Sequence, residues 1–189
     1  MKPETSPPGS GERVSYVIDK DDVIVSVGDD WGRFAAGNGA VQLLAGVVGI
    51  PLWSFVKGLT TRHVYRQLVG RARDGQAVSF TYRCDSPALR RFMRMTMTSR
   101  RDGCVAFESV VERAEPRPPV MILDSVADET DPGLRMCSWC KRVDVLGEWE
   151  ELEIAVERLG LLSLPEPPLI THAMCPACAE RLNAESASA

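Results

Sequence analysis

The sequence predicts an α+β fold in two parts: an antiparallel sheet with helices on one face, followed by a small C-terminal module held by a metal ion. Three observations predict it. Five β-branched runs flank a segment of short helical patterns between residues 12 and 115, an order typical of an antiparallel sheet with helices on one face. Two Cys-x2-Cys pairs follow this region, and a stretch rich in proline and polar residues separates the two parts.

Net charge changes sign between the two parts. The chain has 189 residues, 44% hydrophobic and 25% charged, which suits one ordinary globular domain and a small appendage. Residues 1–119 hold 17 Lys and Arg against 13 Asp and Glu, whereas residues 120–189 hold 5 against 13. We therefore divide the chain into a disordered tail at 1–11, a sheet domain at 12–115, a linker at 116–133, a cysteine module at 134–183 and a disordered tail at 184–189.

The sequence favours a cytoplasmic chain without a membrane segment. Its longest apolar run, AVQLLAGVVGIPLW, is too short and too rich in glycine to span a bilayer. The first residues, MKPETSPPGSGER, have no apolar core of a signal peptide. Thiols stay reduced in the cytoplasm, so the six cysteines favour a metal site or reactive thiols over a disulfide framework.

The first half of the sheet domain predicts a hairpin and then helices. RVSYVID (13–19) and DVIVSVG (22–28) alternate as strands do. Asp30 could cap a short helix at 31–38, which the glycines around Asn38 would end, and VQLLAGVVGIPLWSFV should form short helical pieces. A longer helix is expected at 60–75, with Thr60 or Thr61 as its cap, Gly75 as its end, and an apolar stripe of Val64, Leu68 and either Tyr65 or Val69.

The second half of the sheet domain predicts three strands. They are QAVSFTYRCD (76–85), LRRFMRMTMTS (89–99) and CVAFESVVER (104–113), and RRDG (100–103) forms the turn between the last two.

This order resembles a PAS domain. The resemblance covers most of residues 12–114 and includes the helix start DDWGRFA and the stretch GIPLWSFV before the long helix. It implies a module that senses a ligand or forms a homodimer, with any pocket between the sheet and the helices.

Several residues of the sheet domain could bind a ligand. Met93, Met95 and Met97 share one face of a strand, where they either line an adaptable pocket or pack as ordinary core. His63 lies on the long helix. PAS domains that bind haem can use a histidine there as axial ligand, and surface placement is the alternative. Cys84 and Cys104 are either buried small residues or redox thiols.

Six arginines, at positions 83, 90, 91, 94, 100 and 101, crowd the last strands of the sheet domain. They could form a surface for anions or nucleic acid, or a contact surface for the acidic cysteine module, which we rank first. No nucleotide-binding loop, kinase signature or nucleophile elbow is present, and the chain has two histidines. We therefore expect no catalytic activity.

The cysteine pairs predict a structural metal site. Cys137 and Cys140 in MCSWCKR, with Cys175 and Cys178 in HAMCPAC, could complete a tetrahedron of thiolates around Zn²⁺ without an open position for catalysis. Redox use of one pair and plain burial are the alternatives. His172 stands three residues before Cys175 and could replace one cysteine or support the site from outside. Between the pairs we expect a helix at 148–160, with Trp149 on its apolar side, and then an extended return.

Residues 134–183 also resemble the cysteine segment of bacterial two-component signalling proteins. The likeness includes Lys141, Gly147, Trp149, His172 and Pro176, whereas THAMC departs from the SHGIC typical of that segment. It implies a small, zinc-ribbon-like module near receiver, PAS or kinase modules, and it implies no catalysis.

We expect a non-catalytic signalling protein in which the PAS-like domain senses a ligand or dimerises and the zinc module relays the signal or docks a protein partner. A nucleic-acid-binding regulator is the first alternative, although the net charge of −8 beyond residue 119 opposes contact with phosphates. A haem or redox sensor that uses His63, Cys84 or Cys104 is the second.

Overall fold

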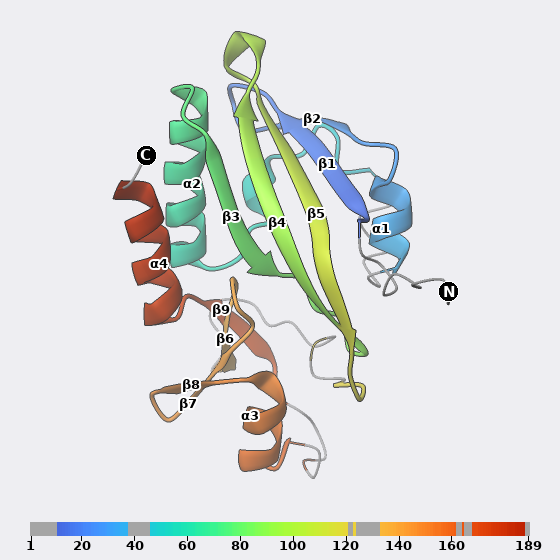
Figure 1. Ribbon diagram of the computed structural model, residues 1–189, viewed down its shortest axis with the longest axis vertical. Helices are drawn as coiled ribbons and strands as arrows, with labels where there is room; N and C mark the ends of the chain where they lie inside the picture. Colours follow the sequence, from blue (N-terminus) through green and yellow to red (C-terminus); the bar gives the residue numbers. More distant parts are fainter. Residues whose placement is uncertain are drawn as a thin grey trace, which may run out of the picture.

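The computed structural model describes residues 11–37, 46–120, 123, 133–161, 164 and 168–187, with the backbone alone at 183–187. Its first part is a five-stranded antiparallel sheet in the order β2-β1-β5-β4-β3 (Figure 1). The strands are β1 (Arg13–Ile18), β2 (Ile24–Val27), β3 (Val78–Arg83), β4 (Leu89–Ser99) and β5 (Val105–Pro116). The predicted α+β class is confirmed. The turn between β4 and β5 is η3 (Arg101–Gly103), at the predicted position.

Helices α1 (Trp31–Gly37) and α2 (Leu59–Arg73), with the short turn η2 (Leu52–Ser54), lie between β2 and β3 in the chain. α1 packs against β1, and α2 packs against β3, β4 and β5. Met93, Met95 and Met97 are all buried on one face of β4, as their alternation predicts. Met95 and Met97 belong to the main buried cluster with residues of α2, and Met93 belongs to a smaller cluster with Val111 and Ala114.

The start of α2 differs from the prediction, because its N-cap is Gly58 and not a threonine. Gly58 has φ +83°, and a Cβ atom there would lie 2.9 Å from the carbonyl oxygen of His172. Glycine is therefore required both by the backbone conformation and by this close approach. Thr61 is buried, and its Oγ1 donates to Oγ of Ser138 at 3.0 Å. The residue expected to cap the helix thus contacts the cysteine module instead.

The second part is a four-stranded sheet in the order β8-β7-β6-β9. β6 (Leu134–Cys137) and β9 (Ile170–Ala173) are parallel, whereas β7 (Val143–Val145) and β8 (Glu148–Glu150) form an antiparallel hairpin. Helix α3 (Leu152–Arg158) follows β8, and α4 (Pro176–Ala187) ends the described chain. α4 therefore continues through most of the segment that we expected to be a tail.

The helix expected at 148–160 is wrong in its first turn. Residues 148–150 form β8, because a tight turn at Leu146 and Gly147, both with positive φ, folds the chain back on β7. The backbone N–H of Gly147 donates to Oδ1 of Asp144 and stabilises this turn. Trp149 is therefore a half-buried strand residue and not part of a helix face. The helix that does form, α3, ends before Gly160, as predicted.

The two parts share a hydrophobic core. Cys137, Trp139, Cys175, Cys178 and Leu182 of the second part join the buried cluster of the first sheet and α2. α4 lies beside α2 and β3 in Figure 1, and Arg181 donates to the side chain and carbonyl oxygen of Thr81 on β3. A separate core of the second part includes Val120, from the expected linker. Arg117 and Val120 therefore contact the second part, so this segment does more than connect the two parts.

Candidate metal centre and junction pocket

Four cysteines from distant segments meet at one point beside the shared core. Cys137 ends β6, and Cys140 lies in the turn after it. Cys175 directly precedes α4, and Cys178 lies in its first turn. Their sulfur atoms all lie within 4.8 Å of one another. Among the described residues this is the group whose geometry could hold a metal ion, and the four predicted ligands are its four members.

Each cysteine pair is held by local backbone bonds. After β6, the N–H of Lys141 donates to the carbonyl oxygen of Cys137 at 3.0 Å, and Lys141 adopts φ +61°. This tight turn directs both sulfurs to the same side. At the second pair, the N–H of Cys178 donates to the carbonyl oxygen of Cys175 at 3.1 Å, and Pro176 begins the helix. Proline suits that position because the first helical N–H has no partner within the helix.

The distances between the sulfurs fit a metal site and not a disulfide. Sγ of Cys140 lies 3.7 Å from Sγ of Cys175, whereas a disulfide needs about 2.05 Å. Four thiolates at about 2.3 Å from a central Zn²⁺ form a tetrahedron whose edges measure about 3.8 Å. The cluster therefore has nearly the size that a tetrahedral metal ion requires.

The electrostatics of the cluster also favour a cation. Hydrogen bonds from Cys140 and then Cys178 lower the pKa of Cys137, and the backbone N–H of Cys175 contributes at 3.4 Å from the Cys137 sulfur. The bond with Cys137 raises the pKa of Cys140 to about 12, and that of Cys178 is raised for the same reason. Among these three thiols the hydrogen bonds thus favour the thiolate at Cys137, and a bound cation would stabilise all four cysteines as thiolates.

His172 is not a member of this four-residue group. It lies on β9 opposite Met136, is half-buried, and lines a pocket beside the cluster. The residues that the structure describes therefore place it as a neighbour of the candidate metal site.

The turn between Cys137 and Cys140 inserts Trp139 into the first domain. Trp139 is 2% exposed, and its ring lies 5.2 Å from that of Tyr65 and 5.8 Å from that of Phe80. Its carbonyl oxygen accepts a hydrogen bond from the N–H of Arg83 at 2.8 Å, so the turn continues the edge of β3. The turn between Cys137 and Cys140 is thus part of the core of the sheet domain.

Arginines of the sheet domain contact acidic residues of the cysteine module. Nη1 of Arg83 lies 2.7 Å from Glu151, and Nη2 of Arg90 lies 2.8 Å from Glu153. Asp85, whose side chain is 0% exposed, pairs with Arg83 and also with Arg117 at 3.2 Å. Arg117 reaches Glu153 as well, at 3.1 Å.

The predicted contact between basic strands and acidic module is confirmed for Arg83 and Arg90. It is wrong for Arg94, which pairs with Glu112 of its own sheet. Arg91 donates to the carbonyl oxygen of Cys84, and Arg100 and Arg101 are exposed at the hairpin beyond β4. Sequence reasoning missed Arg117 because it lies in the expected linker. Its position directly after a predicted strand and beside prolines was the sequence signal that could have identified it as a contact residue.

An apolar cavity of about 310 Å³ lies between the first sheet and its helices. Met95 lines it, whereas Met93 and Met97 are buried elsewhere in the core. Tyr82 donates to Oγ of Ser109 at its wall, at 2.9 Å. The other described residues that line it are mainly apolar and aromatic: Val14, Tyr16, Ile24, Trp31, Phe34, Ala35, Val47, Leu52, Phe55, Val56, Tyr65 and Cys84.

The other residues predicted as ligands or redox thiols differ in their position relative to this cavity. His63 is exposed on α2, bonds to Gln67, and does not line this cavity, so its position does not suit an axial haem ligand. Cys84 lines the cavity, but burial raises its pKa, which opposes its prediction as a low-pKa redox thiol. Cys104 is half-buried beside the start of β5, outside the cavity.

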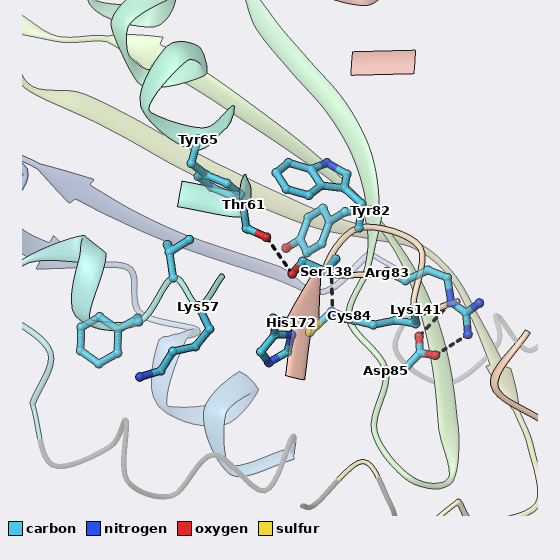
Figure 2. A pocket seen from close by; sticks show the side chains of 13 residues that line it. Lys57, Thr61, Tyr65, Tyr82, Arg83, Cys84, Asp85, Ser138, Lys141 and His172 are labelled. Carbon is cyan, nitrogen blue, oxygen red and sulfur yellow. Dashed lines mark hydrogen bonds and ion pairs between the residues drawn. The ribbon is translucent and has the colours of Figure 1, made fainter. Parts of the chain in front are cut away.

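A second pocket of about 270 Å³ adjoins this cavity at the junction of the two parts (Figure 2). Phe55, Val56, Tyr65, Tyr82 and Cys84 line both spaces. The remaining wall comes from Lys57, Thr61, Arg83, Asp85, Ser138, Trp139, Lys141 and His172.

No protein-family model matches the chain, and no curated protein matches it significantly in sequence. Within the described residues, no helix has the length and apolar character needed to span a membrane.

Proposed function

We propose that this chain is a non-catalytic bacterial signalling protein: a PAS-like domain senses a small ligand, and a zinc-bound cysteine module relays that state to a protein partner. One observation carries the proposal. The apolar cavity of the sheet domain adjoins a second pocket. The turn between Cys137 and Cys140, two of the four clustered cysteines, forms part of the wall of that pocket. A ligand in the cavity of the first domain would therefore contact residues that also line the pocket beside the cysteine module.

The PAS-like assignment is supported by the order of elements. Two strands, helices and three further strands form an antiparallel sheet, with the helices on one face and a cavity beneath them. That is the arrangement which the resemblance implies, including the position of the pocket. Dimerisation through this domain and a role beside a two-component system belong to the same proposal.

Zinc is the proposed metal because four cysteine sulfurs in tetrahedral proximity suit its preferred geometry and its affinity for thiolates. Four protein ligands leave no open position, so the ion would hold the two pairs together and carry out no reaction. The adjacent β-strands have three or four residues each, and a small module of this kind gains much of its stability from its metal.

The relay would act as a shift between two packings of the junction. Trp139 belongs to the core that faces the cavity, and Ser138 bonds to Thr61 of α2. A ligand that favours one position of α2 would favour one position of the cysteine turn. The surface of the second part would then differ between the two states, and a partner could distinguish them.

Native mass spectrometry of the full chain, purified without added metal, tests the proposal. We expect one zinc ion per chain, a dimer, and a small molecule that is lost on denaturation. Less than about half an equivalent of zinc, together with unchanged folding after all four cysteines are replaced by serine, would contradict it.

Nucleic-acid binding ranks below this proposal because Arg83, Arg90 and Arg117 are engaged in ion pairs with Asp85, Glu151 and Glu153. Filter binding to DNA and RNA at low ionic strength checks this ranking, and strongly salt-dependent binding would reverse it. A Soret band in the purified protein would likewise favour the haem sensor.

A further inference from the structure

The junction pocket is built by both parts of the chain. The loop before α2 contributes Phe55, Val56 and Lys57, α2 contributes Thr61 and Tyr65, and β3 with the residues after it contributes positions 82–85. The cysteine turn and β9 complete the wall with Ser138, Trp139, Lys141 and His172. Neither part alone encloses this space, so a ligand bound there would contact both.

The charges that face the pocket leave an excess of positive charge. Asp85 is buried between Arg83 and Arg117, so its negative charge is already compensated. Lys57 and Lys141 also line the pocket, and within the described part of the chain neither forms an ion pair with a carboxylate. Nζ of Lys141 donates to the carbonyl oxygen of Ser138 at 3.1 Å. An ammonium group has three N–H donors, so Lys141 can still bond to an anion.

The two lysines lie on different sides of the pocket. In the view of Figure 2, Lys57 lies on one side and Lys141 on the other, with His172 between them, and the ammonium end of Lys57 is turned away from the other two. Lys57 is exposed, whereas Lys141 is half-buried. The four cysteine sulfurs do not line the pocket, so the formal charges facing it come from the two lysines and the Arg83–Asp85 pair. A carboxylate in the pocket could accept hydrogen bonds from Lys141, and it would meet a second cation once the exposed Lys57 side chain turns inward.

The rest of the wall is aromatic. Phe55, Tyr65, Tyr82 and Trp139 line the pocket, and the first three also line the adjoining apolar cavity. Burial raises the pKa values of Tyr65 and Tyr82, so both phenols stay neutral at physiological pH. A volume of about 270 Å³ lies just below the usual range of about 300–1,000 Å³ for small-molecule sites. The space therefore suits a compact ligand with an apolar or aromatic body.

We propose that the junction pocket binds a small organic acid, with its carboxylate between Lys57 and Lys141 and its apolar body against the aromatic wall. This inference rests on the proposed function, because it names the class of ligand that the sensor takes. It adds that the ligand contacts the cysteine turn directly through Lys141 and Trp139.

Phenylacetate is a suitable probe, and phenylacetamide is its uncharged match in shape. Both are titrated into the zinc-loaded full chain and followed by two-dimensional NMR of backbone amides and indole N–H groups. We expect saturable shifts at Lys57, Lys141 and Trp139, with a Kd at least about tenfold lower for the acid, since charge-assisted hydrogen bonds are roughly twice as strong as neutral ones.

Three variants test the recognition residues. Lys57→Met and Lys141→Met should each weaken phenylacetate binding about tenfold, whereas Lys141→Arg keeps the charge and most of the affinity. Lys20→Met is the matched control, because Lys20 is exposed in the turn between β1 and β2 and pairs with Asp21. Zinc content is measured for each variant, and Lys57→Met decides the question if the Lys141 variants fail to fold.

Equal affinity for acid and amide, no saturable shift with the acid, or an equal loss in Lys20→Met would overturn the proposal. Such a result with a full equivalent of zinc leaves the proposed sensor and relay intact. Phenylacetate binding in a chain without zinc would instead contradict the zinc relay while the pocket stands.

Discussion

The two parts of the molecule are stabilised in different ways. The first sheet has strands as long as eleven and twelve residues, with one face buried under helices. The second has strands of three or four residues and a smaller core of its own. The first part can bury much of its apolar surface under its own helices, whereas we expect the second to depend on its cysteine cluster and on its contacts with the first. In a chain with both kinds of part, metal binding by the second can be coupled to the packing of the first.

The largest expected effect comes from removing the metal. A strong chelator, or the double change Cys137→Ser and Cys175→Ser, should unfold the second part, because structural zinc contributes about 10–16 kcal/mol of apparent binding free energy. Because Cys137, Trp139 and Cys175 belong to the shared core, the first part should be destabilised as well. Hydrogen exchange measured by mass spectrometry should show lost protection in β6, β9 and also β3.

Cys104→Ser is the matched control, since Cys104 is half-buried beside β5 and is not one of the four clustered cysteines. It should retain zinc and protection. If chelation leaves β3 as protected as before, the two parts are independent and the comparison fails.

Trp139→Ala should have the next largest effect. The side chain is buried against Tyr65 and Phe80, and truncating a buried aromatic costs about 3–5 kcal/mol. Since the Trp139 side chain is not a metal ligand, zinc should remain bound while the urea midpoint of the sheet domain falls. The destabilisation would then come from lost packing between the parts.

Trp139→Phe separates ring packing from hydrogen bonding. The indole Nε1 of Trp139 is buried without a hydrogen-bond partner among the described residues. Phenylalanine removes this donor and keeps most of the apolar contact, so it should cost less than half as much as alanine. Equal losses for both variants would mean that the fit of the indole ring is what holds the junction.

The sequence predicted the first part better than the second, for a physical reason. Along β4, Met93, Met95 and Met97 alternate with polar residues, so the period of two identifies both the strand and its buried face. Around Trp149 the local pattern fitted a helix, but the turn at Leu146 and Gly147 pairs the segment with β7 instead. Tertiary pairing of such short strands leaves little periodicity to detect.

The four candidate metal ligands were predictable and their surroundings were not. Spacing alone identified Cys137, Cys140, Cys175 and Cys178, because a pair two residues apart converges on one point. Nothing in the sequence placed Trp139 against Tyr65 or Arg117 against Asp85, since these contacts depend on how the two parts dock. Charge asymmetry did predict that Arg83 and Arg90 would contact the acidic part.

Asp85→Asn tests the buried ion pairs at the junction. It removes the charge that compensates Arg83 and Arg117, whose side chains are 7% and 5% exposed. Breaking a buried pair costs about 3–5 kcal/mol, and the lower end applies because Glu151 and Glu153 remain as partners. Glu112→Gln breaks the exposed pair with Arg94 and should cost about 0–1 kcal/mol. Similar urea midpoints for the two variants would mean that breaking the ion pairs at the junction costs no more stability than breaking an exposed pair.

Glu153→Gln should have the smallest effect, about 1 kcal/mol, because its carboxylate is one-third exposed and partly screened. Glu157→Gln, at an exposed position of the same helix, is the control and should be neutral. Burial acts to raise the pKa of Glu153, but bonds from its own N–H, Arg90 and Arg117 outweigh this and hold the pKa below its usual value.

The unfolded pKa of Glu153 is about 4.3, and the folded pKa lies below it. Its contribution to stability is therefore fully present above that pH and is lost as the pH falls through the folded value. The difference in unfolding free energy between wild type and Glu153→Gln should be constant from pH 8 to pH 6. If this free-energy difference narrows between pH 8 and pH 6, another titrating group must control the contact of Glu153 with Arg90 and Arg117. These ion pairs would then not be what docks the cysteine module on the sheet.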